Sequence, residues 1–329
     1  MTPRIDKSAD ICKCKFTFTY EHAEMDTDRA SQRITLRDGR QLGFAEYGKP
    51  DGIPLMIFHG TPGSRLFPRL DQAEWVQQLG FRVLTPERPG CGISDPAPGH
   101  TISDWADDVE QLADQLGLER FHVAGGSGGG PFALACALRL PARVRSATLF
   151  CSGCPPEVLR ITREMSKGNR LVFFLARYAP LLLRALSAVI GRNIRKPHKP
   201  PGEKAERKFL SQFCAWDRRM LLAQKNDTST AVHAREAFRQ GSAGVYHDMM
   251  LVSHAWGLDL ETNTVPVFLW HGTADTLLPV SSARTFAQLI PGCEAHFIQD
   301  AGHMLLANKD VSSEMMGRIA SLTDERVGR

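Results

Sequence analysis

The feature that most constrains this chain is a serine in a glycine-rich turn at residues 123–130, with the sequence VAGGSGGG. An apolar run ends at this turn, and a helical segment follows from Pro131. Gly125 and Gly129 flank Ser127 in the pattern G-x-S-x-G, which is typical of a sharp strand-to-helix turn at the top of a sheet. Glycines suit such a turn because a Cβ at these positions would collide with neighbouring backbone. The pattern predicts an α/β sheet that presents Ser127 as a nucleophile.

The same turn has a second interpretation as a dinucleotide-binding loop. Gly128, Gly130 and Ala133 fit the looser form of that fingerprint, which also requires an acidic residue at the end of the next strand, roughly 20 residues on. The next strand ends at residues 147–152 with ATLFCS, which holds no carboxylate. We therefore expect no nucleotide cofactor.

A serine needs a base and an orienting acid to act as a nucleophile, and the chain offers both in the order Ser, Asp, His. Asp275 follows the apolar run at 265–270, where it can reach a histidine without interrupting the strand. His303 follows a glycine after the last apolar run, at 295–298. The order predicts a triad of Ser127, Asp275 and His303. Asp248, His247 and His254 are rivals, but they lie away from strand ends, and we interpret them as surface or core residues.

A second strand predicts where a developing oxyanion would be bound. The apolar run at 54–58 ends in HGTPGS at 59–64, whose small and rigid residues let the backbone curl beside the nucleophile. The Thr61 N–H is the expected donor, because Pro62 has none. The Gly128 N–H, directly after the serine, is the expected second donor.

On these motifs the chain resembles the α/β-hydrolase superfamily, in its serine-nucleophile, capped branch of esterases and proline iminopeptidases. The matching segments are HGTP at 59–62, RPGCGISD at 88–95, GGSGG at 125–129, HGTAD at 271–275 and GH at 302–303. The resemblance implies an α/β fold with an eight-stranded, mostly parallel sheet, helices on both faces and a helical cap inserted after strand six. It also implies Ser127 as nucleophile, His303 as base and Asp275 as its partner.

The residue at the nucleophile position narrows the chemistry. Similar proteins that open epoxides or remove halides typically carry Asp there, whereas this chain has Ser127. We expect a serine hydrolase that cleaves a small or medium apolar carboxylic ester through an acyl-enzyme. Alternatives are a proline-type aminopeptidase, a lactonase, a C–C bond hydrolase, or a non-catalytic ligand-binding protein. Proline iminopeptidases commonly carry Trp after the serine, where this chain has Gly128.

Alternating apolar runs and helical segments predict the domain organisation. We expect a poorly ordered segment at 1–30, a core at 31–153 and 264–329, and a helical cap at 154–263. Asp38-Gly39 between two apolar runs predicts a hairpin at the start of the sheet.

One apolar stretch in the expected cap, at 171–190, approaches the length of a membrane span. Arg177, Arg184 and Pro180 within it oppose that interpretation. We expect amphipathic helices around Pro180, with an apolar face that roofs the active site. A peripheral contact with lipid is the alternative, favoured by the basic run RNIRK at 192–196.

Composition excludes several classes of partner. The formal net charge of +4 is small for 329 residues, and no basic stripe interleaved with aromatics indicates nucleic-acid binding. No segment resembles a signal peptide, and the eight cysteines are scattered, which favours free thiols and a cytoplasmic location. Cys12-x-Cys14 and Cys151-x-x-Cys154 lack the further ligands of a zinc site, so we expect no metal. The expected partner is a small-molecule ester or amide substrate; the sequence leaves the oligomeric state undetermined.

Overall fold

The computed structural model describes residues 28–67, 70–159, 161–196, 203–224 and 227–324. The expectation for residues 1–30 therefore falls almost wholly outside the described residues. Its last residues contact the core: Arg29 Nη2 donates to Gly48 O at 3.0 Å, and Arg65 Nε donates to Ala30 O at 2.7 Å.

The described chain forms one eight-stranded sheet in the order β1-β2-β4-β3-β5-β6-β7-β8. The strands are β1 (Gln32–Thr35), β2 (Gln41–Gly48), β3 (Ile53–Phe58), β4 (Phe81–Pro86), β5 (Phe121–Gly126), β6 (Val144–Phe150), β7 (Val267–Gly272) and β8 (Glu294–Ile298). The β1–β2 and β2–β4 pairs are antiparallel, and every later pair is parallel. The predicted α/β fold with its mostly parallel sheet is confirmed.

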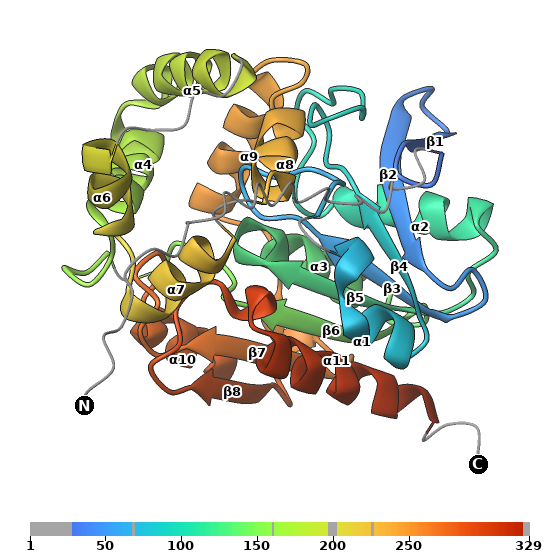
Figure 1. Ribbon diagram of the computed structural model, residues 1–329. Coiled ribbons are helices and arrows are strands. Elements are labelled where there is room, and N and C mark those ends of the chain that lie inside the picture. Colours follow the sequence, from blue (N-terminus) through green and yellow to red (C-terminus); the bar gives the residue numbers. More distant parts are fainter. Residues whose placement is uncertain (1–27, 68–69, 160, 197–202, 225–226, 325–329) are drawn as a thin grey trace, which may run out of the picture.

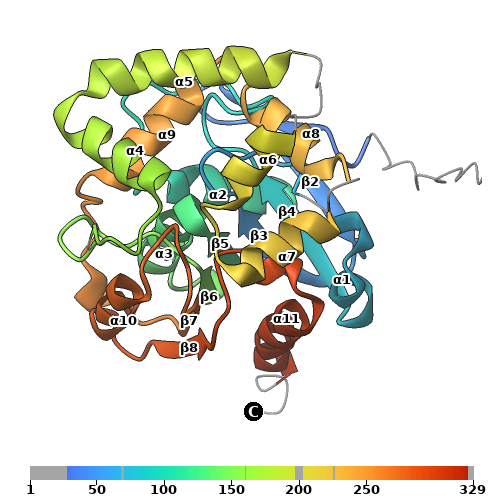
Figure 2. The same ribbon diagram turned by 60° about the vertical axis from the view of Figure 1, so that its left-hand side comes forward.

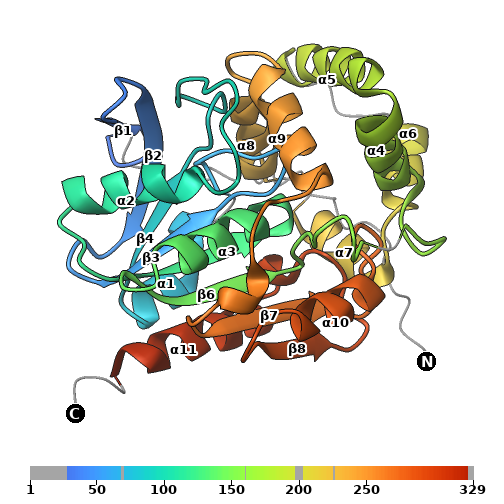
Figure 3. The same ribbon diagram turned by 180° about the vertical axis from the view of Figure 1, so that it is seen from behind.

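Helices cover both faces of this sheet (Figures 1 and 3). On one face lie α2 (Trp105–Gln115), α3 (Gly130–Arg139) and α10 (Val280–Gln288), and on the other lie α1 (Glu74–Gln78) and α11 (Lys309–Asp324). Short 3₁₀ turns occur at η1 (Leu70–Gln72), η2 (Ser127–Gly129), η3 (Leu260–Thr262) and η4 (Leu305–Ala307). Because both faces are covered, burial does not alternate along the central strands, and all six residues of β5 and of β7 are buried.

Between β6 and β7 the chain leaves the sheet and forms a group of helices, which we call the helical insertion (Figure 1). Its helices are α4 (Lys167–Tyr178), α5 (Pro180–Arg195), α6 (Glu203–Leu210), α7 (Ala215–Ala223), α8 (Ser229–Ala237) and α9 (Ala243–Ser253). Pro180 begins α5, because Ala179 before it has the non-helical angles φ −145° and ψ 58°. No helix in the described part of the chain is long and apolar enough to cross a bilayer.

The order of the strands decides where a site forms. The chain leaves β3 through α1 on one face of the sheet and leaves β5 through α3 on the other, although β3 and β5 are neighbours. The loops that follow these two strands lie at the carboxyl end of the sheet, at the switch point where open α/β sheets bind their ligands. Thr61 and Ser127 lie in these two loops.

Candidate active site

Ser127 lies at the tip of a turn with an uncommon backbone conformation. Its φ is +52°, in the left-handed region that non-glycine residues rarely adopt. The turn is too tight for side chains around it, since a methyl group at Gly125 would lie 2.3 Å from Gly129 O. The Gly153 N–H holds the turn from the segment after β6 and donates to Ser127 O at 2.9 Å. Ser127 stays partly exposed while Gly128 and Gly129 are buried, so the hydroxyl is presented at the top of the sheet.

Asp275 and His303 meet directly at the ends of β7 and β8. His303 Nδ1 donates to Asp275 Oδ2 at 2.8 Å. The other carboxylate oxygen accepts from the N–H groups of Leu277 and Leu278, at 2.7 and 3.0 Å. Because the ionised Asp275 only accepts, the proton of the neutral imidazole lies on Nδ1 and leaves Nε2 as a free base.

The environment separates the pKa values of these two groups. Burial by itself raises the pKa of Asp275, but the charge and hydrogen bond of His303 outweigh this and lower it below its usual value. Burial by itself lowers the pKa of His303, but the Asp275 carboxylate and the charge of Asp217 outweigh it and raise the pKa. His303 is therefore a stronger base than an ordinary histidine.

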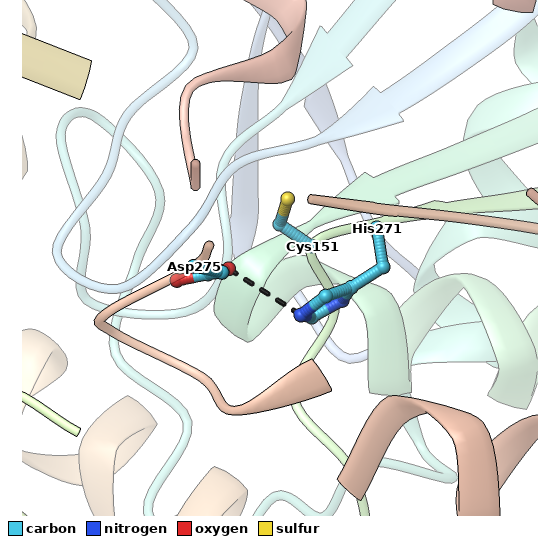
Figure 4. Close-up of side chains that lie close together, drawn as sticks. All are labelled: Cys151, His271 and Asp275. Atoms are coloured by element: carbon cyan, nitrogen blue, oxygen red, sulfur yellow. Dashed lines mark ion pairs between the residues drawn. The ribbon is translucent and has the colours of Figure 1, made fainter. Parts of the chain in front are cut away.

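A second histidine and a cysteine lie against the buried side of Asp275 (Figure 4). His271 Nε2 lies 3.0 Å from Leu278 O and 3.5 Å from Asp275 Oδ2, and burial lowers its pKa. The Cys151 thiol donates to Gly302 O at 3.5 Å, and burial raises its pKa well above the usual value. The ligand-type atoms of Cys151, His271 and Asp275 lie within 4.8 Å of one another, as metal ligands would. The thiol keeps its proton, and both carboxylate oxygens of Asp275 already accept N–H groups. We therefore infer that Cys151 and His271 hold the Asp275 carboxylate in place.

The segment after β6 connects the serine turn to the histidine loop. Gly153 binds Ser127 O, while Cys151 binds Gly302 O directly before His303. Among the described residues no hydrogen bond joins the Ser127 hydroxyl to His303. The structure thus joins Asp275 and His303 directly, and the segment after β6 contacts both the serine turn and the loop that carries His303.

The two expected oxyanion donors are neighbours. A methyl group at Gly128 would lie 3.2 Å from Thr61 N, and one at Gly60 would lie 3.3 Å from Ser127 Cβ. Gly60 O accepts from Arg88 Nη2 at 2.9 Å and from the ring of His59 at 2.8 Å. Since the peptide unit is planar, the Thr61 N–H points away from that carbonyl oxygen. These contacts fix the loop after β3, and the Thr61 N–H is directed away from Arg88.

Arg88 is held by a carboxylate from the helical insertion. Its Nε and Nη2 atoms donate to the two oxygens of Asp248 on α9, both at 2.6 Å, in a buried bidentate pair. Asp248 Oδ2 also accepts from Thr61 Oγ1 at 2.6 Å. Asp248 therefore contacts the loop after β3 and not the imidazole of His303.

A residue that the sequence analysis missed holds the histidine loop from the other side. Asp217 on α7 is fully buried, and its oxygens accept from the N–H groups of His303 and Met304 at 3.0 and 2.9 Å. A methyl group at Gly302 would lie 2.3 Å from Asp217 Oδ1, so the loop and the carboxylate are closely packed. No local pattern marks Asp217, because its partners lie 86 and 87 positions further along the chain.

Comparisons with known proteins agree with this fold. A family model described as alpha/beta hydrolase fold matches residues 53–310. The chain belongs to the alpha/beta hydrolase fold family. The resemblance inferred from the sequence motifs is therefore confirmed.

Among the relatives of this alpha/beta hydrolase is a proline iminopeptidase of Neisseria meningitidis, 34% identical over 297 residues, which are 82% of this chain and 89% of that one. A non-heme chloroperoxidase of Streptomyces lividans is 33% identical over 163 residues, 43% of this chain and 56% of the relative. A thermophilic esterase of Thermogutta terrifontis superposes with a TM-score of 0.58 at 21% identity, covering 90% of this chain and 97% of that one. The last likeness shows the fold alone.

Proposed function

We propose that this alpha/beta hydrolase is a carboxylesterase that cleaves small or medium apolar carboxylic esters through an acyl-enzyme. Ser127 is the nucleophile, His303 its base and Asp275 the group that orients His303. The observations that support this most are the 2.8 Å hydrogen bond from His303 to the buried Asp275 and the left-handed φ of +52° at Ser127. The proposal requires neither a cofactor nor a metal.

The proposed reaction begins when Nε2 of His303 takes the proton of the Ser127 hydroxyl as its oxygen attacks the ester carbonyl. The N–H groups of Thr61 and Gly128 stabilise the oxyanion, each contributing about 3–4 kcal/mol to the transition state. His303 then gives the proton to the departing alcohol, and water releases the acyl group by the same steps in reverse order. In this proposal the segment 154–263 acts as a cap over the reacting groups.

A proline-type aminopeptidase is the second candidate, and the identity to the Neisseria iminopeptidase favours it. Such a substrate carries an ammonium group, which needs a carboxylate in the site. Asp217, Glu236 and Asp248, which reach the core from the helical insertion, already bind core N–H groups or arginines. This arrangement favours an uncharged ester.

Ser127→Ala tests the proposal, with Ser312→Ala on α11 as the matched control. A fluorophosphonate probe is expected to label the wild type and the control but not Ser127→Ala. The panel is p-nitrophenyl esters, proline amides, a lactone and a diketone. Ester turnover that disappears in Ser127→Ala supports the carboxylesterase. Cleavage of proline amides alone supports the aminopeptidase, and an active Ser127→Ala enzyme contradicts both. No labelling and no turnover favours a ligand-binding protein.

A further inference from the structure

The outer side of α4 and α5 is unusually apolar for an exposed surface. Seven of the twelve exposed large apolar side chains in the described chain lie on these two helices. Leu181, Tyr178 and Leu182 are the most open of them, at 78%, 66% and 57% exposure. Exposed large apolar side chains gathered on neighbouring elements mark a surface that contacts a partner molecule or a membrane. We call it the α4–α5 outer surface, comprising the exposed residues of the two helices.

The same helices carry only positive charge. Residues 165–196 contain seven Lys or Arg and no Asp or Glu, whereas the rest of the chain has 33 Lys or Arg and 36 Asp or Glu. Lys167, Arg177, Arg184, Arg192 and Arg195 are exposed. The positive charge of the protein is therefore concentrated on this surface.

The helical periodicity places the apolar and basic residues side by side. In α5 the buried residues Leu183, Ser187 and Gly191 recur every four positions and form the inner side of the helix. Leu182 and Val189 then lie on the outer side, with Arg184 and Arg192 beside the exposed stripe. Figure 2 shows α5 along the outer edge of the molecule, far from the sheet.

An open groove continues this surface beneath α4. It encloses about 680 Å³ and is lined by apolar and basic side chains, among them Leu159, Phe174, Arg170 and Arg177. The start of α4 rests on the Asp275 loop, because the Ser166 N–H donates to Thr276 O at 2.6 Å. The helix α4, which carries part of this surface, is thus bonded to a loop of the candidate active site.

We propose that the α4–α5 outer surface binds an anionic lipid bilayer. Its apolar side chains enter the interface, and its arginines contact lipid phosphates. A zwitterionic bilayer also carries phosphates, but it has no net negative charge to attract the arginines. In a two-fold dimer the same surfaces face each other, which would bring two sets of like charges together. An anionic interface alone complements both the apolar and the basic residues.

The test is sedimentation of the full chain with phosphatidylcholine vesicles that contain or lack phosphatidylglycerol. We expect binding only with phosphatidylglycerol, weakening as salt is raised. Each basic residue near the membrane contributes about fivefold to binding. The variant Arg177→Gln/Arg184→Gln/Arg192→Gln is therefore expected to bind about 100-fold more weakly. Leu181→Ser/Leu182→Ser is expected to lose on the order of tenfold, through reduced apolar burial.

The matched control is the triple variant Arg37→Gln/Arg139→Gln/Lys309→Gln. It removes three exposed positive charges outside the helical insertion, and we expect it to bind vesicles as the wild type does. Circular dichroism melts of all variants verify folding. Equal binding to neutral vesicles, an equal loss in the control, or no binding at all overturns the proposal. So does light scattering that finds a dimer which the leucine variant dissociates, because the occupant is then a second copy.

Discussion

Two groups of helices in the helical insertion differ in the charged side chains that they carry. We call α7, α8 and α9 the inner helices and α4 and α5 the outer helices. The inner helices α7, α8 and α9 each bring a carboxylate to the core: Asp217 to the His303 loop, Glu236 to Arg65 and Asp248 to Arg88. The outer helices α4 and α5 carry no acid and expose arginines beside apolar side chains. Buried charges are costly unless paired, so the inner contacts fix one position of the insertion against the core. The exposed charges of α4 and α5 impose no such constraint.

This difference separates two roles within one insertion. Substitutions on the inner helices should disturb the groups around Ser127, because their partners are the loops after β3 and β8. Substitutions of the exposed residues on the outer helices should leave those groups unchanged.

Asp248→Ala tests the inner contacts most severely. It leaves the Arg88 guanidinium, with only 3% of its side chain exposed, without its carboxylate. We expect the free energy of unfolding to fall by about 3–5 kcal/mol, since an unpaired buried charge is costly. Urea unfolding followed by tryptophan fluorescence measures the loss. Glu74→Ala is the control, because its partner Lys309 is 68% exposed and the expected loss is below about 1 kcal/mol. Similar losses of unfolding free energy in Asp248→Ala and Glu74→Ala would mean that the buried ion pair of the inner helix contributes no more than an exposed one.

Asp217→Asn tests whether an inner helix sets the strength of the base. The amide keeps the size of the side chain, but it removes a charge that raises the pKa of His303. Activity requires neutral His303 and is lost as pH falls through that raised pKa. With the charge gone the pKa falls, so the acid limb of kcat/KM should move to lower pH. The altered loop should also lower the plateau about tenfold.

The measurement for Asp217→Asn is the pH profile of kcat/KM with a soluble p-nitrophenyl ester. Asp217→Glu, which keeps the charge, is the control and should retain the acid limb nearer its original position. An acid limb unchanged in Asp217→Asn would mean that Asp217 holds the loop without affecting the base.

The sequence predicted the core side of the candidate site better than its insertion side. Ser127, Asp275 and His303 follow apolar strands, and the strand-end rule alone brings their loops to one edge of the sheet. Asp248 was interpreted as an ordinary surface or core residue, yet it lies in a buried ion pair with Arg88. Helical periodicity shows which side of α9 is buried but not which loop that side meets, because the partners are 160 positions apart.

The sequence also left the apolar side of α4 and α5 incompletely described. We expected it to roof the active site. In the structure Leu175 and Leu183 are buried in a cluster with Met249 of α9, whereas Phe174, Leu181 and Leu182 are exposed. Amphipathicity predicts that a helix has an apolar side, whereas the packing of neighbouring helices decides how much of that side is covered.

The smallest expected effects on stability and turnover are those of substitutions on the outer helices. They test whether these helices are independent of the candidate active site. Leu181→Ser and Arg184→Gln change exposed side chains that have no hydrogen-bonded or ionic partner in the described structure. We expect the free energy of unfolding to change by no more than about 0.5 kcal/mol, because neither substitution opens a cavity or leaves a buried charge unpaired. Turnover of a soluble ester should stay within about twofold of the wild type. A large loss of turnover with unchanged stability would mean that α4 and α5 also shape the site. In that case charge alone would not distinguish the helices that position the reacting groups from those that do not.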